Sequence, residues 1–109
     1  MRKASVAALF LVMTTSPAIF AAGNADAGKA VYAKRCVTCH AEDGNGKEAI
    51  AKMMKVTITP LPSKEVQALS DDELGKVITQ GKGKMKPIKD LSATDVTNLV
   101  AFIRSLAKK

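Results

Sequence analysis

The stretch CVTCH, residues 36–40, contains both cysteines and the only histidine of this 109-residue chain. The segment before it, YAKR, reads as the end of a helix. Residues three and four positions apart on a helix project onto one face, so Cys36, Cys39 and His40 are expected to point the same way. Two thiols at that spacing can add across the two vinyl groups of one haem, and the adjacent imidazole can then reach the iron. C-x-x-C-H is the attachment motif for haem c.

Three other kinds of site use the same residue types. A zinc site needs four ligands, and the sequence has no second cluster that would complete a tetrahedron. A thioredoxin-like dithiol normally follows a strand in an α/β fold, whereas the segment before Cys36 is helical in pattern. A structural disulfide that closes so short a loop would constrain the unfolded chain little. One covalent haem c with its iron, bound through Cys36, Cys39 and His40, is therefore the preferred interpretation.

Residues 1–28 have the outline of a secretory signal. They begin with two basic residues, continue with a mostly apolar run and end in small residues where a signal peptidase could cleave. Ser16 and Pro17 interrupt the apolar run, which leaves it short of the roughly 20 residues that a membrane-spanning helix needs. We therefore expect a cleavable signal at residues 1–22, a single domain at residues 23–109, and export to the periplasm.

The charge of the chain restricts its partners. The formal net charge is +7, and loss of the two basic residues of the signal leaves 15 basic against 10 acidic residues, or +5. Such a balance suits an acidic protein, a membrane surface or nucleic acid. For an exported chain nucleic acid is the least favoured of these. The remaining domain of about 85 residues has a small core, and domains of this size often need additional stabilisation, for example by disulfides or a bound metal.

The hydrophobic periodicity of the domain is helical throughout, and no segment alternates for long enough to indicate a strand. Four segments read as helices, two of them opened by capping boxes: 24–35, 46–55, the segment starting at Ser70 with Glu73, and the segment starting at Ser92 with Asp95. One face of the first helix would comprise Ala27, Ala30, Val31 and Lys34. Residues 56–63 contain two prolines and are expected to form an irregular connector. The sequence predicts an all-α fold of about four helices with long loops.

On these residues the sequence resembles the small soluble class I c-type cytochromes, from about Asp26 to Leu106. The matching stretches are DAGKAVYAKRCVTCH, AEDGNG, GKGKM and LVAFIRSL, at residues 26–40, 41–46, 81–85 and 99–106. The resemblance implies the class I cytochrome c fold, in which the first and last helices cross near one haem. The residues that would meet at this crossing are Gly28, Tyr32, Leu99 and Phe102.

The second axial ligand of the iron is a separate question, because His40 is the only histidine. Methionine is the natural candidate, and the family takes this ligand from a loop after the third helix, so the resemblance implies Met85. Gly81 and Gly83 would let that loop bend close to the porphyrin. Where the family often has Met-Pro, Lys86 intervenes here.

Met53, Met54 and Pro60 could each have a purely structural role. Met53 and Met54 lie on an apolar helical stripe and are interpreted as core residues. Pro60 resembles the family proline whose carbonyl accepts the second ring proton of the ligating histidine. Its alternative role is to shape the loop.

The function implied is electron transfer through the haem iron, with no substrate turned over and therefore no catalytic residues. If Met85 did not ligate the iron, a haem-based sensor or a weak peroxidase would be the alternative. The expected partners are redox proteins with acidic docking surfaces, with docking to membrane redox complexes, and the protein is expected to be a monomer. The lysines that cluster about Met85 could form the docking surface or simply be solvated: Lys82, Lys84, Lys86 and Lys89.

Overall fold

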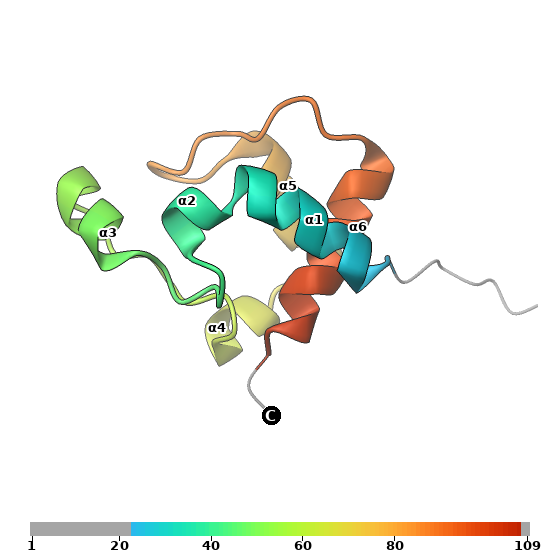
Figure 1. Ribbon diagram of the computed structural model, residues 1–109, viewed down its shortest axis with the longest axis horizontal. Helices are drawn as coiled ribbons and strands as arrows, with labels where there is room; N and C mark the ends of the chain where they lie inside the picture. Colours follow the sequence, from blue (N-terminus) through green and yellow to red (C-terminus); the bar gives the residue numbers. More distant parts are fainter. Residues whose placement is uncertain (1–22, 108–109) are drawn as a thin grey trace, which may run out of the picture.

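Helices from the two ends of the domain cross each other (Figure 1). The computed structural model describes residues 23–107, so the signal predicted at residues 1–22 lies outside the described part. The described chain forms six helices and no strand: α1 (Ala25–Arg35), α2 (Val37–His40), α3 (Glu48–Met54), α4 (Lys64–Gln67), α5 (Asp71–Gln80) and α6 (Ala93–Ser105). The all-α prediction is confirmed.

All four predicted helices form, and two helices of a single turn accompany them. The helix α2 is the attachment motif itself, and α4 follows the predicted connector, where the Ser63 hydroxyl accepts a hydrogen bond from the backbone N–H of Val66. A single turn is too short to show a hydrophobic period, so the sequence pattern did not predict α4, and it predicted the motif turn only as the end of the first helix, not as a separate helix. The estimate of about four helices was therefore two too low for residues 23–107.

Side chains at the helix ends explain where the longer helices begin. The Asn24 side chain accepts from the N–H of Ala27 at the start of α1, at 3.0 Å. Capping boxes at Ser70 and Ser92 open α5 and α6 as predicted. In contrast, α3 has no side-chain cap and ends at Lys55 in a left-handed conformation, with a φ of 56°. The long helices are thus locally specified, whereas α3 is weakly specified.

The contact between α1 and α6 is very close at Gly28. A Cβ atom there would lie 1.9 Å from the carbonyl oxygen of Asn98, so only glycine allows this approach. One turn further on, the rings of Tyr32 and Phe102 pack with their centroids 4.8 Å apart. The crossing that the resemblance implied is confirmed. The buried residues of α1 are Gly28 and Tyr32, and not the face of Ala27, Ala30, Val31 and Lys34, of which only Val31 is even half-buried.

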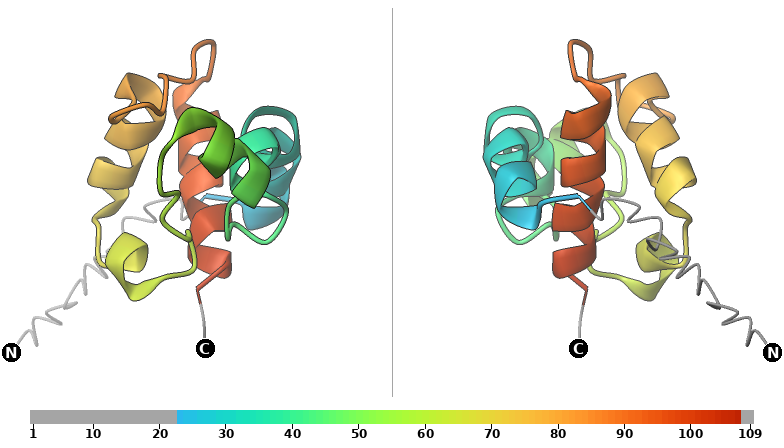
Figure 2. Two further views of the ribbon diagram at one scale, coloured as in Figure 1. Left: turned by 90° about the vertical axis from the view of Figure 1, so that its left-hand side faces the viewer. Right: turned by 90° about the vertical axis from the view of Figure 1, so that its right-hand side faces the viewer.

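The core lies along α6, which runs between α1 on one side and α5 on the other (Figure 2). Its buried side chains are Tyr32, Val66, Leu74, Ile78, Leu99, Val100, Phe102 and Ile103. Cys36 and Val37 are partly buried and pack against this cluster, so the attachment motif starts at the edge of the core. No helix within residues 23–107 has the length and apolarity needed to cross a membrane.

Candidate functional site

The attachment motif forms one turn of helix directly after α1. The backbone N–H groups of Cys39 and His40 donate to the carbonyl oxygen of Cys36 at 3.3 and 3.0 Å. These bonds place the three side chains at helical positions i, i+3 and i+4, on one side of the turn. All three residues are half-buried, and Ala41, with a φ of 63°, ends the turn. The predicted geometry of the motif is therefore present.

The two thiols are free in the structure, so the disulfide interpretation receives no support. Burial raises the pKa of the Cys36 thiol to about 11; the nearby Arg35 opposes this rise and Cys39 adds to it. The thiol is thus protonated near neutral pH. Within residues 23–107, no three side chains of His, Cys, Asp or Glu form a group that could hold a metal ion.

The imidazole of His40 is half-buried and incompletely bonded. Burial lowers its pKa below the usual value, so the ring is neutral near neutral pH, which is the form that ligates metals. Its Nδ1 atom is buried and has no hydrogen-bond partner among the described residues. Buried polar atoms are nearly always bonded, and one left without a partner costs about 1–3 kcal/mol. A neutral, unpartnered imidazole beside two thiols fits a bound haem iron, which would occupy one ring nitrogen and orient the other.

The connector at residues 56–63 lies beside the loop that follows the motif. The backbone N–H of Leu61 donates to the carbonyl oxygen of Gly44 at 2.9 Å. Pro60 is exposed, and its carbonyl oxygen accepts from the N–H of Ser63 at 3.1 Å. No bond from His40 to Pro60 is present among the described residues. A carbonyl oxygen has two lone pairs, so the role of Pro60 stays a prediction.

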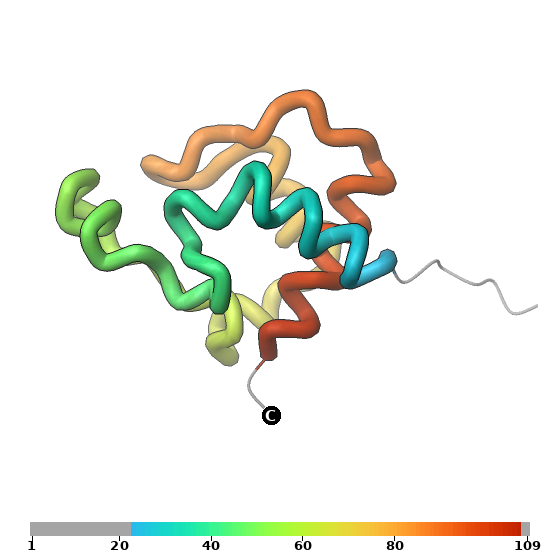
Figure 3. The backbone as a smooth tube through the Cα atoms, viewed as in Figure 1, coloured from blue at the N-terminus to red at the C-terminus, as the bar shows by residue number. Residues whose placement is uncertain are grey.

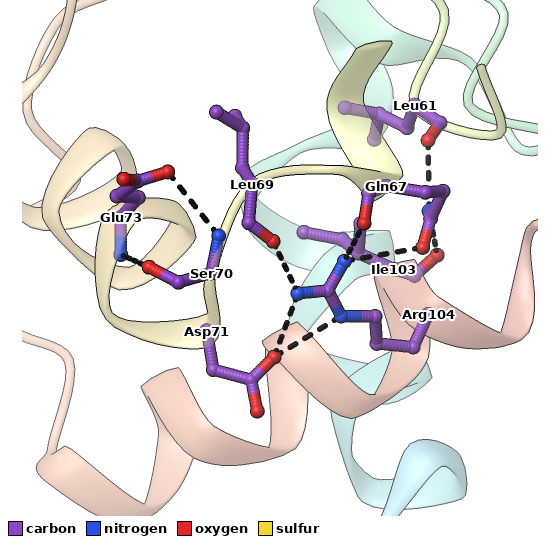
Figure 4. Close-up of polar contacts among 8 residues, drawn as sticks. All are labelled: Leu61, Gln67, Leu69, Ser70, Asp71, Glu73, Ile103 and Arg104. Carbon is purple, nitrogen blue, oxygen red and sulfur yellow. Dashed lines mark hydrogen bonds and ion pairs between the residues drawn. The ribbon is translucent and has the colours of Figure 1, made fainter. Parts of the chain in front are cut away.

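A hydrogen-bond cluster around Arg104 holds this connector and α4 against α6 (Figure 4). The Arg104 guanidinium donates to the carbonyl oxygens of Gln67 and Leu69 and forms an ion pair with Asp71 at 2.8 Å. The Gln67 amide in turn donates to the carbonyl oxygen of Leu61 at 2.9 Å. The partners of Arg104 lie more than 30 residues away in the sequence, so no local pattern indicated this cluster.

Met85 is half-buried and lies at the end of a tight turn. Lys82 and Met85 exchange two backbone hydrogen bonds, of 3.0 and 2.9 Å. The loop bends at Gly81 and Gly83 as predicted, and both residues have a positive φ, of 77° and 57°. A Cβ at Gly81 would lie 2.5 Å from the carbonyl oxygen of Met85, so the backbone at Gly81 lies unusually close to the backbone at Met85.

The interpretation of Met53 as a core residue is wrong. Its side chain is 71% exposed, whereas Met54 and Ile50 are half-buried. Helical spacing placed Met53 near an apolar stripe, but a stripe is buried only where another element packs on it. No contact between α3 and another helix is extensive in the described chain. Of the three methionines considered as ligand or core, Met53 is the most exposed to solvent.

Comparison with known proteins supports the same interpretation. The sequence model of the family described as cytochrome c oxidase, cbb3-type, subunit III matches residues 23–103. This chain belongs to that cytochrome c family. The chain is also 30% identical over 100 residues to a cytochrome c6 of Rippkaea orientalis (strain PCC 8801 / RF-1), covering 91% of this chain and 84% of that protein. A solved structure, the KustC0563 c-type cytochrome, is similar with a TM-score of 0.62 and 28% identity, covering 74% of this chain and 98% of that one.

Membership of the cytochrome c family implies covalent haem, and Cys36 and Cys39 fit its attachment motif. One further feature of this cytochrome was not expected from the sequence. The Tyr32 hydroxyl donates to the carbonyl oxygen of Ala41, next to His40. Its sequence spacing of 9 residues follows no helical or strand period, so no pattern indicated it.

Proposed function

We propose that this cytochrome carries single electrons between protein partners through one haem c. The observation that supports the proposal best is the motif turn at residues 36–40, which presents two free thiols and a half-buried, neutral imidazole on one side. Iron held by haem with histidine and methionine ligands changes between the ferric and ferrous states. In this proposal Cys36 and Cys39 would hold the haem as thioethers, and His40 and Met85 would ligate its iron.

With two axial ligands supplied by the chain, no position on the iron remains for a substrate. The protein would then be a carrier and not an enzyme. The sensor or weak peroxidase stays the alternative for a protein in which Met85 does not reach the iron. A thioether ligand raises the reduction potential relative to a second imidazole, which suits a carrier.

The proposed partners are redox proteins with acidic docking surfaces. The lysines of the Met85 loop are all exposed and carry positive charge beside the proposed ligand: Lys82, Lys84, Lys86 and Lys89. The family's description names a subunit of a cytochrome c oxidase, so a membrane redox complex is one class of partner that we propose. We also propose that the protein acts in the periplasm as a monomer, after cleavage of the signal predicted at residues 1–22.

The proposal is tested with the mature protein produced together with a c-type haem maturation system. We expect a red protein whose ferric form shows the weak far-red absorption band of thioether sulfur on iron and whose ferrous form binds carbon monoxide poorly. A colourless product would refute the haem. A red product without the far-red band, which binds carbon monoxide readily, would refute the Met85 ligand and favour the sensor or peroxidase.

A further inference from the structure

Two basic side chains form hydrogen bonds that connect the loop carrying Met85 to the rest of the domain. Lys84, directly before this methionine, donates from Nζ to the carbonyl oxygen of Met54 at 2.7 Å. Arg35, the last residue of α1, donates from Nη2 to the carbonyl oxygen of Lys89 at 2.9 Å. The first bond joins the loop to the end of α3, and the second joins it to the residue that precedes the attachment motif. Figure 3 shows the segment between α5 and α6 passing above α1 and α2 in that view.

The turn at residues 82–85 has few other restraints. Its two backbone hydrogen bonds run within the turn, between Lys82 and Met85. The next backbone bond is that of the Ile88 N–H to the carbonyl oxygen of Ile78, at 2.9 Å. Among the described residues, the Lys84 side chain therefore makes the turn's one hydrogen bond to another part of the protein. Nothing packs near Gly83 at its tip, where a Cβ would meet no atom within 4 Å.

The acceptor at the end of α3 is suited to hold a cationic side chain. The carbonyl oxygen of Met54 is among the last four of α3, which have no partner within the helix. Hydrogen bonds from a charged donor are about twice as strong as those between neutral groups. A thioether is a weak ligand for ferric iron, so a loop that moved freely would lose it readily. The bonds of Lys84 and Arg35 oppose that movement from two sides.

We propose that Lys84 and Arg35 are positioning residues that keep Met85 at the iron. The inference rests on the axial role proposed for Met85 and adds that basic side chains from the loop and from α1 maintain it. Lys84 thereby differs from its neighbour Lys86, which carries the same charge in the same loop and makes no hydrogen bond or ion pair within residues 23–107. The difference between these two lysines is the basis of the test.

The experiment uses the complete haem-loaded protein and measures how fast imidazole displaces the ligand from ferric iron, followed by loss of the far-red band. Lys84→Leu should raise the displacement rate about threefold to tenfold, because one charged hydrogen bond that closes the loop is lost. Lys86→Leu removes the same charge and should stay within about twofold of the parent protein. Lys84→Arg keeps a charged donor and should restore the parent rate.

The role of Arg35 is tested in the same way, by comparing a variant of Arg35 with a control variant of Lys34. Arg35→Leu should also accelerate displacement, whereas Lys34→Leu, which removes a charge from the same turn of α1, should not. The reduction potential should fall further in Lys84→Leu and Arg35→Leu than in their charge-matched controls, because a weaker thioether bond favours ferric iron. Urea unfolding of each variant separates loop opening from loss of overall stability.

The outcomes distinguish this inference from the proposed function. If the parent protein lacks the far-red band, the Met85 ligand is refuted and the positioning role with it. If the parent has the band but Lys84→Leu and Lys86→Leu exchange ligand equally fast, the positioning role alone is overturned. Lower overall stability without faster displacement or a lower potential would show an ordinary structural role and would likewise overturn it.

Discussion

The Tyr32 hydroxyl in α1 donates a 2.5 Å hydrogen bond to the carbonyl oxygen of Ala41, the residue that directly follows His40. Burial, above all, raises the pKa of the phenol well above its usual value, so the hydroxyl keeps its proton throughout the neutral range. The bond ties the end of the motif turn to the middle of α1. It therefore couples the proposed axial ligand to the core.

Replacing Tyr32 with phenylalanine tests this bond. The variant keeps the ring that packs on Phe102 but loses the donor, so the free energy of unfolding should fall by about 1 kcal/mol. Urea denaturation of the haem-loaded protein measures the change. Tyr32→Leu also loses the ring contact and should cost more, roughly 2–4 kcal/mol. Unchanged stability in Tyr32→Phe would mean that the hydrogen bond contributes nothing net.

Gly28→Ala tests the close crossing of the first and last helices. The new Cβ would lie 1.9 Å from the carbonyl oxygen of Asn98, so α1 and α6 would have to separate. We expect a loss of about 1–3 kcal/mol in thermal or urea unfolding. Gly75→Ala in α5 is the control, because its Cβ would only touch Val96 at 3.4 Å. That variant should gain up to about 1 kcal/mol from the higher helix propensity of alanine.

The haem attachment is tested by extraction with acidified acetone. Two thioethers should retain the haem in the parent protein, and the Cys36→Ala, Cys39→Ala double variant should release all of it. Each single variant should keep the haem through its remaining thioether, in lower yield. Free extraction from the parent protein, or retention by the double variant, would refute covalent attachment at these positions.

Met85→Ala tests the sixth ligand. The far-red band of the ferric protein should disappear, the reduction potential should fall, and the ferrous iron should bind carbon monoxide, because a ligand position opens. Met53→Leu is the control. The Met53 side chain is 71% exposed, so the Met53→Leu protein should keep the far-red band, and its free energy of unfolding should change by less than about 0.5 kcal/mol. A Met85→Ala protein that retains the band would assign the ligand to another residue.

The docking role of the lysines is tested by the dependence of electron transfer on salt. With an acidic redox partner, the bimolecular rate should fall steeply between low and physiological ionic strength. Lys86→Gln with Lys89→Gln should lower both the rate at low salt and its salt dependence. The control pair Lys29→Gln with Lys64→Gln removes the same charge from α1 and α4. Equal effects of the two pairs would mean that net charge, and no local surface, attracts the partner.

Much of the fold could be predicted because its physics is local. Capping boxes at Ser70 and Ser92 bond within four residues, and α5 and α6 begin where these boxes predicted. The bend at Gly81 and Gly83, where φ is positive, was likewise predicted from residue type. The one-turn helix α4 escaped prediction because a single turn has no period, and the motif turn α2 was expected only as the end of the first helix. The exposure of Met53 escaped it because burial depends on what packs against a helix face.

The sequence by itself determined the chemistry at residues 36–40, since a single helical turn brings the two thiols and the imidazole to one side whatever surrounds it. Only the tertiary structure decided how that turn and the Met85 loop are held. The bonds from Tyr32 to Ala41, from Lys84 to Met54 and from Arg35 to Lys89 span 9, 30 and 54 residues. Such bonds follow no sequence period, because they form between side chains and carbonyl oxygens that approach each other only after the helices have packed.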